Sequence, residues 1–125
     1  MYNQRIVVRP ARSNDAEVVA KAVAMAIGDE VALQNYCGAE YLDVLAEIAR
    51  REATQYSWQY ALVAEVDGVT AGAVVGYDGA RLSELREGTF AVLRERMGQE
   101  SFQKAHTTPD SNQQYAQLYE QVASL

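Results

Sequence analysis

The 125-residue chain has one cysteine, Cys37, one histidine, His106, and two prolines. A single cysteine cannot form an internal disulfide, so the sequence gives no sign of an oxidising compartment. With one Cys, one His and no carboxylate cluster at suitable spacing, we expect no metal site. A nucleophilic Cys37–His106 pair would require the fold to join two distant segments, and packing in a loop is the favoured role for Cys37.

The sequence also lacks an excess of positive charge and any long apolar run. It has 11 Lys and Arg against 17 Asp and Glu, which gives a net charge of −6. Because an acidic chain repels phosphate backbones, nucleic acid is not an expected partner. No stretch approaches the roughly 18 apolar residues of a membrane span, and the N-terminus has no apolar signal region. We therefore expect a cytoplasmic protein without membrane association.

The first half of the chain predicts one strand and two helices. Ile6, Val7 and Val8 are β-branched and Pro10 ends their run, which is typical of a short strand. Asn14 and Glu17 have capping-box spacing, so a helix should follow them and stop at Gly28. Residues 29–38 are expected as a loop or short helical turn, and residues 39–52 as a second helix with an apolar stripe.

The pair Asp67-Gly68 is the clearest local signal, because it lies between two apolar runs and is typical of a type I′ hairpin turn. We expect strands over 58–66 and 69–77, with Val66 opposite Val69. This register gives one wholly apolar face, which should pack on the core. That face comprises Trp58, Tyr60, Leu62, Ala64, Val66, Val69, Ala71, Ala73, Val75 and Tyr77.

The last third of the chain predicts two helices separated by a polar loop. Residues 80–97 should form a long helix with a bend at Gly88, residues 98–109 a loop, and residues 111–123 an amphipathic helix. The order β-α-α-β-β-α-α indicates an α+β fold with a small mixed or antiparallel sheet flanked by helices. We expect a single domain, made of a main region over 1–110 and a C-terminal helix over 111–125.

Two segments in this order resemble the GNAT N-acetyltransferase family. The run Ile6-Val7-Val8-Arg9-Pro10-Ala11 followed by Asp15-Ala16 is similar to the family's first strand and its entry into the first helix. The run from Ala61 to Gly72, ALVAEVDGVTAG, resembles its second and third strands. The resemblance covers residues 5–79 and implies the N-terminal half of a GNAT-like domain.

The resemblance implies transfer of an acetyl group from acetyl-CoA, as co-substrate, to a small-molecule or peptide amine. This chemistry needs a base for the amine, an N–H group aimed at the thioester oxygen and a backbone nest for the pyrophosphate. In the family the nest follows the fourth strand, with the pattern Gln or Arg, two residues, Gly, one residue, Gly or Ala. None of the eight glycines has Gln or Arg three places earlier, so this loop is not found.

By the family's layout, the residues around an acceptor would include Glu30, Tyr36, Tyr77 and Asp78. Each has a structural alternative. Glu30 can also be a solvated carboxylate in a loop. Tyr36 can also be a side chain that covers the core. Tyr77 reads as the packing partner of Trp58 across the hairpin, and Asp78 as a turn residue before glycine.

The resemblance gives no catalytic residue. Some family members use a tyrosine on a late helix as general acid, and Tyr115 and Tyr119 lie on the predicted late helix. Both also lie on its apolar stripe, where packing is the favoured role. Two functions therefore stay open. The first is a GNAT-type acetyltransferase acting on an unknown amine, or the truncated and inactive half of one, and the second is a non-catalytic module. The module would bind a partner, or form a homodimer, through the open edge of its small sheet.

Overall fold

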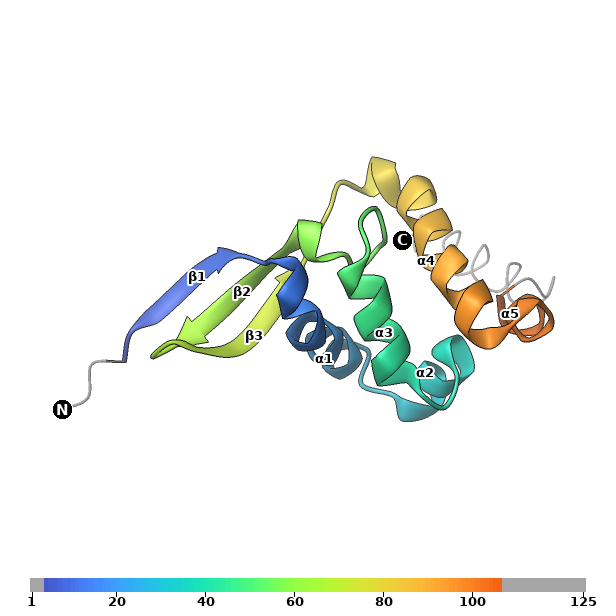
Figure 1. The fold of residues 1–125 in the computed structure, drawn as a ribbon, viewed down its shortest axis with the longest axis horizontal. Coiled ribbons are helices and arrows are strands. Elements are labelled where there is room, and N and C mark those ends of the chain that lie inside the picture. The colour runs from blue at the N-terminus through green and yellow to red at the C-terminus, as the bar shows by residue number, and fades with distance from the viewer. Residues whose placement is uncertain (1–3, 107–125) are drawn as a thin grey trace, which may run out of the picture.

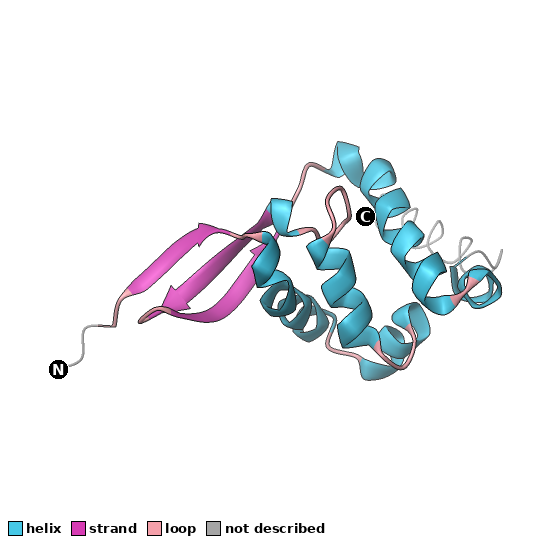
Figure 2. Ribbon diagram, in the orientation of Figure 1, coloured by secondary structure: helices cyan, strands magenta, loops and turns pink. Residues whose placement is uncertain are grey.

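A computed structural model describes residues 4–106 and shows strands at one end and helices at the other (Figures 1 and 2). The strands are β1 (Ile6–Pro10), β2 (Ala61–Val66) and β3 (Val69–Val75). The α-helices of this range are α1 (Ala16–Ile27), α2 (Glu30–Cys37), α3 (Tyr41–Arg50), α4 (Leu82–Met97) and α5 (Gln99–His106). The predicted α+β class is confirmed.

The sheet has the order β1-β2-β3 and is antiparallel throughout the described residues. Asp67 and Gly68 have φ of 51° and 82°, which are the positive angles of the predicted type I′ turn, and Val66 pairs with Val69 as expected. The register then shifts because Ala64 pairs with Gly72, so one residue of β3 bulges out. Beyond the bulge, Leu62 pairs with Val74 instead of with Ala73.

The prediction of the core-facing side is wrong for β2 but holds for the end of β3, where Ala73 and Val75 pack against the core. On β2, Ala61 and Val63 are buried on the inner face, whereas Leu62, expected in the core, is 46% exposed. The inner face of β2 also carries Glu65, whose charge is paired with Arg9, so the wholly apolar face was not the buried one. The outer face carries large apolar side chains that nothing in the described residues covers. These are Ile6 (64% exposed), Val8 (63%), Leu62 and Val74 (62%).

An ion-paired cluster joins the sheet to the start of α1. The Arg9 guanidinium donates to both carboxylate oxygens of Asp15, at 2.8 and 3.1 Å, and to Glu65 on β2. Asp15 Oδ2 also accepts the Arg12 backbone N–H at 2.8 Å. Asp15, and not the predicted Asn14, is therefore the residue that precedes and organises α1.

Two helices lie in stretches for which no full helix was expected, since residues 29–38 were predicted as a loop or short helical turn and residues 98–109 as a loop. Helix α2 forms over residues 30–37 because Asp29 Oδ1 accepts the N–H groups of Val31 and Ala32. Helix α5 follows Gly98, whose φ of 86° ends α4. The expected helix over 111–123, with Tyr115 and Tyr119, lies outside the described residues.

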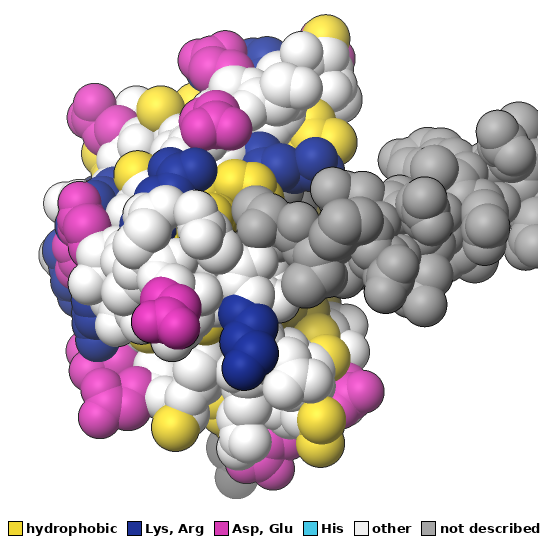
Figure 3. All heavy atoms as spheres, turned by 90° about the vertical axis from the view of Figure 1, so that its right-hand side faces the viewer, with side chains coloured by type: hydrophobic (Ala, Val, Ile, Leu, Met, Phe, Trp, Pro, Cys, Tyr) yellow, Lys and Arg dark blue, Asp and Glu magenta, His cyan; other side chains and the backbone are white. Residues whose placement is uncertain are grey.

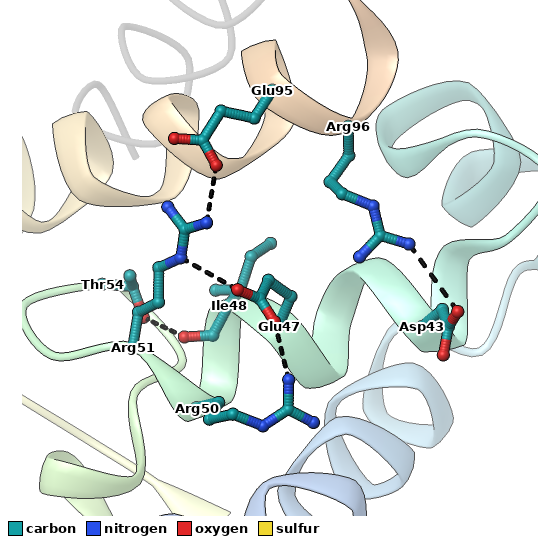
Figure 4. A network of polar contacts seen from close by, with 8 residues as sticks. All are labelled: Asp43, Glu47, Ile48, Arg50, Arg51, Thr54, Glu95 and Arg96. Carbon is teal, nitrogen blue, oxygen red and sulfur yellow. Dashed lines mark hydrogen bonds and ion pairs between the residues drawn. The ribbon is translucent and has the colours of Figure 1, made fainter.

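Helix α4 lies tightly against the segment that follows α3. Helix α4 runs unbroken through Gly88, where a bend was predicted. A bend is therefore not the reason for a glycine at this position. A Cβ at Gly88 would lie 2.1 Å from the Ala53 carbonyl oxygen, so only glycine permits the approach. Arg51 donates to Glu47 on α3 and to Glu95 on α4, and Arg96 pairs with Asp43 (Figure 4).

The helical end of the molecule has a mixed charged surface. Acidic and basic side chains are interspersed over it, with no large area of one sign (Figure 3). In the described range 4–106, no helix is both long enough and apolar enough to cross a membrane.

Candidate functional site

An apolar cleft of about 440 Å³ opens where the second half of α1, the end of β3 and the segment after α3 meet. Its volume lies within the roughly 300–1,000 Å³ typical of small-molecule sites. None of its lining residues is charged. The lining consists of Ala22, Val23, Ala26, Ile27, Gln55, Tyr56, Ala73, Val74, Val75 and Tyr77.

The segment after α3 that forms one wall of the cleft is held by helices α3 and α4. Thr54 Oγ1 donates to the Ile48 carbonyl of α3 at 2.7 Å (Figure 4). The Gln55 backbone N–H donates to Thr89 Oγ1 of α4 at 3.0 Å. Because Thr54 and Thr89 are both fully buried, these bonds fix the backbone that presents Gln55 and Tyr56 to the cleft.

The side chain of Gln55 contains a buried hydrogen-bond acceptor that is unpaired among the described residues. Its side-chain oxygen, Oε1, is shut off from solvent and has no hydrogen-bond partner among the described residues. Leaving a buried acceptor unpaired costs about 1–3 kcal/mol.

Tyr56 and Tyr77 supply the other polar groups of the lining. Burial raises the pKa of the Tyr56 hydroxyl, with smaller contributions from Tyr77 and Cys37, so Tyr56 stays protonated and able to donate. The Tyr77 ring packs edge-on against Tyr60 with centroids 6.2 Å apart, and Tyr60 carries the Arg81 guanidinium 5.1 Å from its centroid. The predicted pairing of Tyr77 with Trp58 across the hairpin is wrong, because β2 begins only at Ala61, after a 3-10 turn that contains Trp58, and β3 ends at Val75.

The four sequence-predicted acceptor residues do not meet in one cleft. Only Tyr77 lines the cleft described above, while Glu30 borders a second cleft beside Lys21 and Asp29. Asp78 Oδ1 accepts the Ala80 N–H at 2.9 Å and begins a short 3-10 turn, as its turn reading predicted. The Tyr36 ring packs edge-on against His106, with centroids 4.6 Å apart.

Cys37 and His106 do not form an activated pair. Burial raises the pKa of the Cys37 thiol to about 12, so the thiol stays protonated at neutral pH. His106 Nε2 lies 2.9 Å from the Tyr36 carbonyl oxygen and donates to it. Within residues 4–106, no three His, Cys, Asp or Glu side chains are grouped to hold a metal ion.

Sequence reasoning missed Gln55 and Tyr56, which lie in a short polar segment between a helix and a strand. No periodicity marks such a segment, and its two threonine contacts are made to residues 6 and 34 positions away. The available signal was weak: a run of polar and aromatic residues, Thr54 to Trp58, directly before the hairpin.

Comparison with known proteins gives one informative similarity. No protein-family model and no curated protein sequence matches the chain. A solved structure described as "The crystal structure of acetyltransferase" matches with a TM-score of 0.61 and 25% identity. The match covers 71% of this chain and 48% of that one, so the chain spans about half the length of the acetyltransferase that it matches. The similarity indicates an acetyltransferase-like fold.

Proposed function

We propose that this chain supplies the acceptor-binding part of a GNAT-type N-acetyltransferase, which moves an acetyl group from acetyl-CoA to an amine. The observation that carries the proposal is the uncharged cleft beside β3, in a fold similar to half of an acetyltransferase. The Arg-Pro-Ala segment at the end of β1 and the Asp-Gly hairpin support the same family. The residues of the cleft would bind and orient the amine, with Tyr56 as a protonated donor.

The described residues do not fit the pyrophosphate of CoA. A pyrophosphate is bound by free N–H groups and positive charge at a helix N-terminus. Each of the five described α-helices instead carries an acidic residue in its first turn, which would repel the anion. These residues are Glu17, Glu30, Asp43, Glu84 and Glu100. No Lys or Arg lines the cleft either, so we derive no CoA-binding step from these residues.

Titration of acetyl-CoA into the purified chain by calorimetry tests the proposal, with desulfo-CoA as the comparison ligand. Binding in the micromolar range would support acetyl transfer and justify a screen of amines. No heat and no thermal stabilisation at millimolar acetyl-CoA would rule out acetyl transfer by this chain.

The open edge of the sheet favours a second candidate, a non-catalytic module that binds another copy of the chain. Among the described residues β3 pairs only with β2, and Val69–Val75 contains no charge and no proline. Natural edge strands usually carry such protection against pairing. The exposed apolar face next to this edge, with Leu62 and Val74, would be covered in a homodimer.

Sedimentation equilibrium over a wide range of chain concentrations tests this second candidate. A dimer that Val74→Lys disrupts would support it, because the Val74 side chain is 62% exposed and its replacement should leave the monomer folded. A monomer at every concentration would rule out a homodimer.

A further inference from the structure

The open edge of β3 presents backbone groups whose direction follows from the ladder. The Gly76 N–H donates to the Tyr60 carbonyl at 3.0 Å, so these two residues continue the antiparallel ladder as a hydrogen-bonded pair. Bonded and non-bonded pairs alternate along such a ladder, so Val75 and Ala61 form a non-bonded pair. The Ala61 carbonyl instead accepts the Ala11 N–H, at 3.0 Å, on the other side of β2. The N–H and C=O groups of Val75 therefore point away from β2, toward the open edge.

The same alternation applies to Ala73, which lies opposite Val63 two residues earlier in β3. Within residues 4–106, β3 pairs only with β2, so the outward groups of Ala73 and Val75 have no strand partner in this range. Both residues are only partly buried. Two donors and two acceptors at alternate residues of an edge strand are the groups with which an extended peptide pairs.

The apolar cleft of about 440 Å³ lies beside these backbone groups. Ala73 and Val75 both line it, whereas no residue of β1 or β2 does. The facing wall is α1, which packs against β3 (Figure 1) and contributes the small side chains of Ala22 and Ala26. Side chains alternate between the two faces of a strand, so every second side chain of a strand added to β3 would point into the cleft. Because no lining residue is charged, these side chains should be large and uncharged.

A second copy of β3 does not supply such side chains. Near the cleft, the inner face of β3 carries Ala73 and Val75, which are too small to fill it. An edge-to-edge pair of identical chains would thus leave the cleft open.

We infer that the edge of β3 and the cleft together bind an extended peptide segment of another protein, with large apolar side chains such as leucine at alternate positions. Its backbone pairs with Ala73 and Val75, and its alternate side chains lie between β3 and α1. The inference goes beyond the proposed function, because a peptide that pairs with β3 needs no acetyl-CoA.

Amide NMR titration of the ¹⁵N-labelled full chain with the peptide acetyl-KSLTLTK-amide, without acetyl-CoA, tests this inference. We expect the amide signals of Ala73 and Val75 to shift and their hydrogen exchange to slow, because their N–H groups become hydrogen-bonded. The signals of Ala22 and Ala26 should shift as the leucines enter the cleft. Replacing both leucines by asparagine keeps the charge of the peptide and should weaken binding about tenfold or more.

N-methylation of the peptide separates backbone pairing from unspecific apolar contact. In an extended peptide, the N–H groups of the two leucines and those of the two threonines point to opposite sides, so only one set reaches β3. Methylating that set should weaken binding about tenfold or more, as the loss of two hydrogen bonds allows. Methylating the other set should leave binding unchanged. The leucine set is the sensitive one in antiparallel pairing, and the threonine set in parallel pairing.

Two substitutions in the chain assign the binding to this edge and this cleft. Ala73→Pro removes an outward donor without removing a bond to β2, and should weaken peptide binding about fivefold or more. Ala26→Phe fills the cleft from α1 and serves if the proline variant does not fold. Met25→Phe is the matched control, because Met25 is 81% exposed on α1 and does not line the cleft.

Several results would overturn the inference. These are no shifts at millimolar peptide, equal weakening by the two methylated peptides, or undiminished binding to Ala26→Phe. Shifts of Ala73 and Val75 that follow chain concentration in the absence of peptide would show that a second copy occupies the edge. Because acetyl-CoA is absent, a failure here is distinct from a failure of acetyl-CoA to bind in the calorimetry.

Discussion

The contact between α3 and α4 differs from the sheet in how completely its groups are covered and paired. On α4, Leu85, Val92 and Leu93 are fully buried, Thr89 makes two hydrogen bonds, and Arg51 bridges two carboxylates. The sheet has one covered face, one exposed apolar face and an open edge at β3. The exposed apolar side chains and the open edge thus lie on the sheet, whereas the one unpaired buried atom among the described residues, Gln55 Oε1, belongs to the segment held by α3 and α4.

Adding one methyl group at Gly88 should break the helical contact most severely. The new Cβ in Gly88→Ala would clash with the Ala53 carbonyl, so we expect a loss of about 3 kcal/mol in the free energy of unfolding. Without the clash, alanine would stabilise the helix by about 1 kcal/mol relative to glycine. The sign of the change in the free energy of unfolding therefore shows whether the clash occurs. Urea denaturation measures it.

Gly72→Ala is the matched change in the sheet. No atom lies within 4 Å of a Cβ at Gly72, so this variant should be neutral or more stable by up to about 1 kcal/mol. Equal losses in the two variants would contradict the difference between the regions.

Substitutions at two neighbouring residues of β2 compare the buried face of the sheet with its exposed face. Val63→Ala removes a fully buried side chain and should cost roughly 2 kcal/mol. Leu62→Ala removes a larger side chain that is 46% exposed, and should cost less than about 1 kcal/mol. Thermal unfolding of both variants at low chain concentration measures this. A Leu62 loss as large as that of Val63 would mean that the outer face is covered in solution.

Asp15→Asn tests the junction between the sheet and the helices. The neutral amide cannot replace the ionised acceptor of Arg9 and the Arg12 N–H, so we expect a loss of roughly 2 kcal/mol at pH 7. The Arg9 hydrogen bond lowers the pKa of Asp15 in the folded chain. The contribution of Asp15 is therefore present above its unfolded pKa and is lost as the pH falls through its lower folded pKa. Urea denaturation at neutral and acidic pH should show the difference from the natural chain shrinking in acid. A pH-independent difference would contradict this.

His106 should give the smallest effect, a pH dependence at the helical end. Burial lowers the pKa of His106, against the raising effect of its bond to the Tyr36 carbonyl. Stability that requires neutral His106 is thus present above its unfolded pKa, near about 6.5, and is lost as the pH falls through the lower folded pKa. The melting temperature should fall from pH 7 to pH 5, and less so in His106→Phe. An identical slope in both proteins would exclude His106 as the cause.

Local signals predicted the elements whose causes are local. Asp67-Gly68 predicted the hairpin turn, because this pair tolerates the positive φ angles that the turn needs. The β-branched run before Pro10 predicted β1. Helix α2 was predicted only as a loop or short helical turn, because its start signal is the Asp29 side chain, and helix α5 was missed because its residues are mostly polar. Of the candidate site residues, only Tyr77 lies in the cleft, since its position at the end of β3 is itself a local property.

By itself the sequence determined the α+β class, the hairpin and a resemblance to acetyltransferases, all of which follow from neighbouring residues. The tertiary structure alone decided which face of β2 is buried, because the buried face with Ala61 and Val63 also carries Glu65, which is paired with Arg9 of β1. It also decided the position of Gln55, which depends on the hydrogen bond from Thr54 to Ile48 and on the bond from the Gln55 N–H to Thr89, 34 residues ahead. Such contacts have no periodicity, so the cleft and the unpaired acceptor emerge only when the chain is folded.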